Sequence, residues 1–172
     1  MIDWFFRWWL RRGRYRWSKI RRYLFERGYL ANALPPAGFP EAVRAVLRQI
    51  TWTRDGPLHL FDCISYPQTV WTRKKDDCDG FAVLAAALLR RDLPASDPVL
   101  LTVMLRPMSA SHTVCAFHTA PDAICFFDNA ALRCEYTHDY GDVAALITGG
   151  NRRVCWDVRD PETLELREFH TG

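Results

Sequence analysis

One cysteine of the sequence lies where a thiol could act as a nucleophile. Cys78 opens an alanine- and leucine-rich run that ends at Arg91 and predicts a buried helix, because apolar residues occupy nearly all of its sides. Unpaired N–H groups and the dipole at a helix N-terminus stabilise a thiolate and can donate hydrogen bonds to an oxyanion. The carboxylates of Asp76, Asp77 and Asp79 oppose a thiolate, so this chemistry requires a nearby imidazolium.

A histidine and an aspartate on consecutive predicted strands complete a constellation for acyl transfer. His112 opens a strand that extends to His118, and Asp128 ends the next strand, which begins at Ala123. In an antiparallel hairpin the start of the first strand lies beside the end of the second. Asp128 is therefore placed to orient the imidazole, and His112 to exchange a proton with Cys78, which are the roles of a Cys–His–Asp triad.

Simpler interpretations of these side chains stay open at this point. Cys78 could be a structural thiol, His112 a solvated strand end and Asp128 the cap of a turn. A zinc site made of His112, Cys115 and His118 is disfavoured, because a strand places Cys115 on the opposite side and separates the histidines by about 20 Å. The calcium-loop pattern of an EF-hand is absent. We expect no metal and no cofactor, since a thiolate itself supplies the chemistry.

The donors that would stabilise an oxyanion come from two places in the sequence. The backbone N–H of Cys78 is the natural first donor. The preceding loop offers a second from a side chain, and Gln68 and Trp71 both carry N–H groups there. A packing role is the more ordinary one for Trp71.

Composition and periodicity predict an α+β domain. The chain has 172 residues, of which 49% are hydrophobic and 25% charged, so disorder and fibrous repeats are excluded. Helices are predicted first and strands afterwards, with residues 51–77, which contain Asp55-Gly56-Pro57, turn-rich and irregular. Besides the elements named above, the pattern predicts helices over 3–29, Pro40–Ile50 and Asp142–Ile147, and strands over Val99–Leu105 and Arg152–Val158.

The charge distribution divides the chain into a basic aromatic arm, 1–34, and a main domain, 35–172. Residues 1–27 contain nine basic and two acidic residues, against fourteen basic and eighteen acidic in the remainder. Such an arm suits a protein partner, including its own acidic body or a second copy, an anionic membrane surface, or nucleic acid. Docking on protein is the preferred interpretation, because no side of the predicted helix is cleanly apolar.

Six cysteines do not by themselves indicate disulfides in this chain. No C-x-x-C pair occurs, and a 20.0 kDa domain can build its own core, so reduced thiols are expected. The first residues do not resemble a secretory signal, and no apolar run approaches the roughly 18 residues of a membrane span. We expect a cytoplasmic protein, with peripheral association with a membrane left open.

Three motifs in the order Cys, His, Asp resemble those of the transglutaminase-like superfamily, and most closely its bacterial transglutaminase-like cysteine proteinases. They are Asp77-Cys78-Asp79-Gly80-Phe81-Ala82, Ser111-His112-Thr113-Val114 and Phe126-Phe127-Asp128-Asn129. The resemblance spans roughly 40–158. It implies a papain-like fold with the cysteine helix packed on an antiparallel sheet, a catalytic triad, and a bacterial or bacteriophage host.

Two positions depart from the family's pattern, and one segment agrees with it. Asp76 stands where the family usually has glycine, and Gly80 where it often has an acidic residue. The run from Tyr66 to Trp71 is similar to a segment with Trp and Pro that often precedes the family's cysteine.

The resulting hypothesis is a thiol enzyme acting on an amide bond of a peptide or protein substrate. Hydrolysis of a peptide or isopeptide is preferred, and transfer to an amine stays open. The alternative is a catalytically idle scaffold or assembly component whose basic arm is the functional part.

Overall fold

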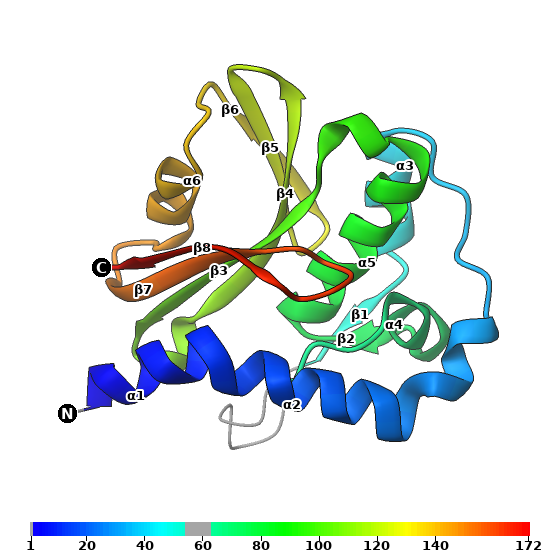
Figure 1. The fold of residues 1–172 in the computed structure, drawn as a ribbon. Coiled ribbons are helices and arrows are strands. Elements are labelled where there is room, and N and C mark those ends of the chain that lie inside the picture. The colour runs from blue at the N-terminus through cyan, green and yellow to red at the C-terminus, as the bar shows by residue number, and fades with distance from the viewer. Residues whose placement is uncertain (1, 54–62) are drawn as a thin grey trace.

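The computed structural model describes residues 2–53 and 63–172, which form helices on both sides of an antiparallel sheet. The N-terminal helical segment is continuous over residues 2–31 and alternates between helix types: α1 (Ile2–Trp8), the π turn η1 (Trp9–Gly13), α2 (Arg14–Arg21), the π turn η2 (Arg22–Glu26) and the 3-10 turn η3 (Arg27–Ala31). Figure 1 shows it as one long rod along an edge of the molecule, which confirms the helix predicted over 3–29.

The remaining helices are short except for the one that begins at the cysteine. They are α3 (Pro40–Leu47), α4 (Pro67–Arg73), α5 (Cys78–Asp92), α6 (Tyr140–Ile147) and the 3-10 turns η5 (Pro94–Ser96) and η6 (Met108–Ala110). The buried helix predicted from Cys78 is confirmed, and ten of its fifteen residues are buried.

The main sheet has six strands in the order β6-β5-β4-β3-β7-β8, and every pair is antiparallel. Its strands are β3 (Val99–Arg106), β4 (His112–Ala120), β5 (Ala123–Asp128), β6 (Ala131–Glu135), β7 (Arg152–Arg159) and β8 (Leu166–Thr171). Two short strands, β1 (Thr51–Trp52) and β2 (Lys75–Asp76), pair in parallel beside it. The predicted α+β class is confirmed.

Both faces of the sheet are covered, which explains why its central strands are almost wholly apolar. Alternate residues of β3 belong to two cores. Leu100 and Met104 join the core that contains α5 and α3, whereas Leu101 and Val103 join the core beneath α6. Trp9 belongs to the first of these cores, so the change in composition at residue 34 does not mark a boundary between two cores.

From residue 14 onward, the side of the N-terminal helical segment that faces the body contains buried polar residues. Arg14, Ser18, Arg22 and Glu26, each four residues from the next, are all buried. Positions spaced by four drift about 40° per step around an α-helix. The π turns rotate the chain less per residue and offset that drift, so the four side chains stay on one side.

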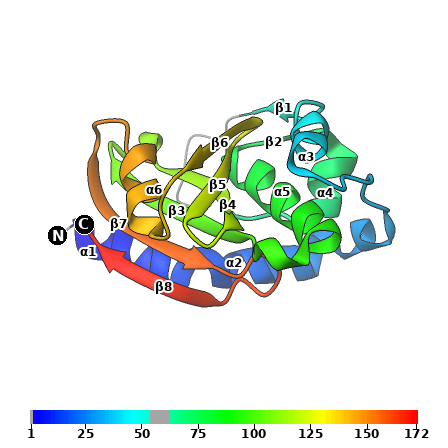
Figure 2. The ribbon, with the colours of Figure 1, turned by 90° about the horizontal axis from the view of Figure 1, so that it is seen from above.

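These buried polar groups form hydrogen bonds with the residues just before and within α4. Glu26 accepts hydrogen bonds from the backbone N–H of Tyr66 at 2.8 Å and from the hydroxyl of Thr69 at 3.1 Å. Arg22 donates through Nε to the carbonyl oxygen of Ile64 at 3.0 Å. Figure 2 shows the sheet and α5 lying over the segment.

The expectation that residues 51–77 are irregular is wrong where the structure describes them. This range contains β1, α4 and β2, while Asp55-Gly56-Pro57 lies outside the described residues. Pro67 begins α4, and a proline at the first position of a helix is favourable because no N–H is needed there.

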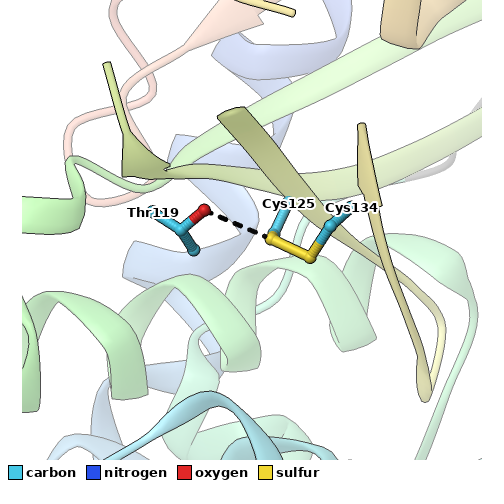
Figure 3. Close-up of a disulfide and its surroundings, with 3 residues drawn as sticks. All are labelled: Thr119, Cys125 and Cys134. Carbon is cyan, nitrogen blue, oxygen red and sulfur yellow. Dashed lines mark hydrogen bonds between the residues drawn. A yellow bond between two sulfur atoms is a disulfide. The ribbon is translucent and has the colours of Figure 1, made fainter. Parts of the chain in front are cut away.

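The expectation of reduced thiols is wrong for one pair. Cys125 and Cys134 form a disulfide between β5 and β6, and the hydroxyl of Thr119 donates a hydrogen bond to the Cys125 sulfur at 3.5 Å (Figure 3). The two cysteines are direct cross-strand partners with Cα atoms 3.9 Å apart. The pairing depends on the register of β6, a strand that the sequence pattern did not reveal. Cys63, Cys78, Cys115 and Cys155 are not part of a disulfide.

Among the described residues, no helix combines the length and the apolar character needed to span a bilayer.

Candidate active site

Cys78 lies at the first position of α5, and the residues around it fix that helix start. The side chain of Asp77 caps the helix by accepting a hydrogen bond from the backbone N–H of Asp79 at 3.0 Å. Apolar packing of the rest of α5 against β4 and β5 holds the helix in place. The thiol is partly exposed, and it lies in the first helical turn, where N–H groups have no partner within the helix.

His112 and Asp128 meet as the strand order predicts. Strands β4 and β5 pair antiparallel, and the Nε2 atom of His112 lies 2.8 Å from Oδ1 of Asp128. Arg133 on β6 approaches the other carboxylate oxygen of Asp128 at 3.5 Å. Because Asp128 occupies Nε2, the ring nitrogen that is left for Cys78 is Nδ1.

The electrostatics of the site favour a charged imidazole. Burial of His112 opposes the charge, but the hydrogen bond that the ring donates to Asp128, the hydrogen bond with Cys78 and the charges of both groups outweigh burial and raise the pKa of His112 to about 10. The hydrogen bond from His112 in turn lowers the pKa of Asp128, against the effect of burial. The site therefore holds the imidazolium that the acidic surroundings of Cys78 require.

A cavity of about 430 Å³ opens over these groups. Cys78 and His112 line it together, and Asn129, which follows Asp128, contributes to its wall. The indole of Trp52 and the side chain of Trp9 also line it. An extended peptide segment or a side-chain amide could reach the thiol there.

Arg14 is a site residue that the sequence analysis missed. It extends from α2 to the start of α5, where its guanidinium forms a buried ion pair with Asp79. It also donates a hydrogen bond to the hydroxyl of Thr102 at 3.3 Å, and it lines the same cavity as Cys78. An oxygen of Asp79 lies 4.0 Å from the Cys78 sulfur, so Arg14 neutralises a negative charge next to the thiol.

A sequence signal for Arg14 exists in retrospect. The polar residues Arg14, Ser18, Arg22 and Glu26 recur every fourth position, which places them on one side of a helix. The polar side of a helix ordinarily faces solvent, so this pattern did not indicate that Arg14 is buried at the site.

A second buried polar cluster binds the same helix to the sheet beside the site. Tyr15 donates a hydrogen bond to Asp157 at 3.0 Å, and Arg159 forms an ion pair with Asp157 at 2.7 Å. Burial raises the pKa of Asp157 to about 6, although Arg159 acts in the opposite direction.

Two carboxylates and the thiol at the start of α5 could in principle hold a metal ion, since the ligand atoms of Asp77, Cys78 and Asp79 lie within 4.8 Å of one another. However, Asp77 caps the helix and Asp79 pairs with Arg14. A cation would have to displace Arg14, so these residues fit a metal poorly.

The two candidate oxyanion donors lie away from the thiol. Gln68 and Trp71 are both on α4. Gln68 lines a different cavity with Arg22, and Lys74 covers the ring of Trp71. Among the described residues around the Cys78 cavity, neither of the two contributes to the wall. The backbone N–H of Cys78 is the better-placed donor.

The side chain of Asp76 packs directly against Gly80 at the start of α5. A Cβ atom at position 80 would overlap with Cβ and Cγ of Asp76. The Asp76 side chain therefore occupies the space that a side chain at position 80 would need, and it accepts a hydrogen bond from the backbone N–H of Asp77 at 2.9 Å.

This fit predicts a strong dependence between the two positions. Gly80→Ala should lower the free energy of unfolding by about 1–3 kcal/mol because the added methyl group overpacks the site. In an Asp76→Gly background the same change should be neutral or stabilising by up to about 1 kcal/mol, the helix preference of alanine over glycine. Denaturant unfolding of the four proteins measures this coupling, and an equal cost in both backgrounds would contradict the fit.

Neither a protein-family model nor a curated protein sequence matches the chain.

Proposed function

We propose that the chain is a thiol-dependent acyl-transfer enzyme that acts on amide bonds, with hydrolysis of a peptide or isopeptide as its main reaction. One observation carries this proposal: Cys78 and His112 line the same cavity. Cys78 lies there at a helix N-terminus, and the Nε2 atom of His112 lies 2.8 Å from Oδ1 of Asp128. A purely structural thiol or a solvated histidine would not require a helix N-terminus, a carboxylate partner and a shared cavity in one place.

In the proposed mechanism, the thiolate of Cys78 attacks the substrate carbonyl and forms a carbon–sulfur bond. The backbone N–H groups at the start of α5 stabilise the oxyanion. The imidazolium of His112 gives its proton to the leaving amine as the carbon–nitrogen bond breaks. Water then attacks the thioester while His112 takes its proton, and cleavage of the carbon–sulfur bond restores the thiolate. Asp128 orients the ring throughout.

We also propose a transglutaminase-like, papain-like core. The three sequence motifs around Cys78, His112 and Asp128 support it, and so does the close packing of Asp76 against Gly80. Each of these positions departs from the family's usual residue, but the departures compensate in space, because the Asp76 side chain takes the place that an acidic residue at position 80 would use.

Acylation by p-nitrophenyl acetate tests the proposed chemistry without knowledge of the natural substrate. We expect an acetyl group on Cys78, found by mass spectrometry of its peptide, and none on that peptide from Cys78→Ala. Cys63, the other partly exposed cysteine outside the disulfide, serves as the internal control. Acetylation of Cys78 that is no faster than that of Cys63 would overturn the proposal.

The fate of the acetyl group distinguishes a hydrolase from a transferase. Loss of the group to water at a rate unaffected by added glycinamide supports hydrolysis. Formation of N-acetylglycinamide in proportion to the added amine would instead assign an amine transferase.

A further inference from the structure

The outward side of the N-terminal helical segment carries large apolar side chains, whereas polar residues are buried on its inward side from Arg14 to Glu26. Large exposed side chains recur along it and form what we call the apolar strip: Trp4, Trp8, Trp17, Ile20, Tyr23 and Leu24. Trp4 is 72% exposed and Leu24 61%. A helix that only packed on its own domain would be expected to bury these residues and to expose Arg14 and Glu26.

Positive charge borders the strip. Arg12, Arg16 and Lys19 are exposed, and the guanidinium of Arg27 lies 4.8 Å from the centre of the Tyr23 ring. The sequence has one acidic residue between positions 4 and 30, Glu26, and that side chain is buried and hydrogen-bonded to the body. This side of the segment therefore presents cations without carboxylates of its own.

The helical segment that carries the strip runs along one edge of the molecule. From residue 4 to residue 24 a helix extends about 30 Å, and the labelled elements of Figure 1 lie on one side of it. Single-stranded nucleic acid is usually bound in a basic groove, whereas an exposed rod fits a flat surface. Tryptophan and tyrosine are enriched at the boundary between lipid headgroups and acyl chains, where arginine and lysine reach anionic headgroups.

We propose that this side of the N-terminal helical segment binds an anionic lipid surface, with the apolar strip at the membrane interface and the bordering arginines and lysine at the headgroups. The proposal is independent of the chemistry at Cys78, since none of the strip residues lines that cavity among the described residues.

Vesicle sedimentation of the full chain tests it. We expect binding to mixed phosphatidylcholine and phosphatidylserine vesicles at least about tenfold tighter than to phosphatidylcholine alone, weakened by added salt. Trp17→Ser/Ile20→Ser/Leu24→Ser should reduce binding to the mixed vesicles by about tenfold or more through lost apolar burial. Arg16→Glu/Lys19→Glu should reduce it to a similar extent.

A matched variant controls for general loss of surface apolar area. Phe39→Ser/Tyr136→Ser/Leu146→Ser removes three similarly exposed side chains elsewhere and should bind as the wild type does. Wild-type protein that stays in the supernatant with mixed vesicles would overturn the proposal, as would a strip variant that sediments like the wild type. Equal binding to both vesicle types would also overturn it. So would light scattering that shows a dimer lost only in the strip variant, which would assign the strip to a second copy.

Discussion

Arg14→Met is expected to cause the largest loss of stability of any single change outside the apolar core. Arg14 is 3% exposed and Asp79 1%, so removing the guanidinium leaves a buried carboxylate without its counter-charge. Breaking a buried ion pair in this way costs about 3–5 kcal/mol. The same change adds an uncompensated negative charge beside the Cys78 thiol, so the reactivity of Cys78 should fall as well.

Denaturant unfolding measures the effect, and two further variants interpret it. Arg12→Met, which removes an exposed arginine two positions earlier on the same helical segment, should change the free energy of unfolding by less than about 0.5 kcal/mol. Arg14→Met/Asp79→Asn should recover much of the loss because it removes the carboxylate that Arg14→Met leaves without a counter-charge. If Arg14→Met costs less than about 1 kcal/mol, which is the range of a surface ion pair, the pair contributes little to the fold.

The second large effect is expected at His112. In the proposed mechanism the charged imidazole pairs with the sulfur of Cys78, and the pKa of His112, raised to about 10 by its hydrogen bonds against the effect of burial, keeps the imidazole charged across the neutral range. His112→Ala removes that charge, so alkylation of Cys78 by iodoacetamide at about pH 6 should slow by roughly 100-fold, since an ordinary thiol of pKa ~8.5 is almost wholly protonated there.

A second histidine on the same strand is the matched control for that variant. His118 is partly buried, and its Nε2 atom lies 3.1 Å from the hydroxyl of Tyr140, away from the cavity. His118→Ala should leave the labelling rate of Cys78 within about twofold of the wild type. Equal slowing by both variants would indicate a general loss of structure rather than a thiolate–imidazolium pair.

The central elements of the fold are those that the sequence predicts best. Helix α5 begins at the predicted Cys78 and ends at Asp92, one residue beyond the prediction, and β5 has the predicted bounds Ala123–Asp128. These elements are buried, so their apolar, aromatic and β-branched content leaves little ambiguity. The meeting of His112 with Asp128 follows from strand order alone, which is why spacing in the sequence could suggest it.

The two edge strands, β6 and β8, were not predicted. Their residues are mostly exposed, and β6 includes Arg133 and Glu135. An edge strand pairs on one side only and can be largely polar, so the alternating pattern is weak. The Cys125–Cys134 disulfide was missed for the same reason, because it requires the register of β6.

The role of the N-terminal helical segment could not be derived from composition. Its basic and aromatic residues suggested an arm separate from the main domain, whereas Arg14 and Glu26 are buried and Trp17 and Leu24 are exposed. Partners that lie far away in the sequence, such as Asp79, decide which side of this helix faces inward. Local periodicity does not contain that information.

The most direct test of the proposed enzyme is the rate at which iodoacetamide labels each cysteine outside the disulfide in the wild-type chain at about pH 6, measured by mass spectrometry. Cys63 has the same exposure class as Cys78, while Cys115 and Cys155 are buried. We expect Cys78 to be labelled at least about tenfold faster than Cys63, and His112→Ala to remove the difference. Labelling of Cys78 at or below the rate of Cys63, with both thiols reactive at high pH, would contradict an activated thiol and the proposed enzyme with it.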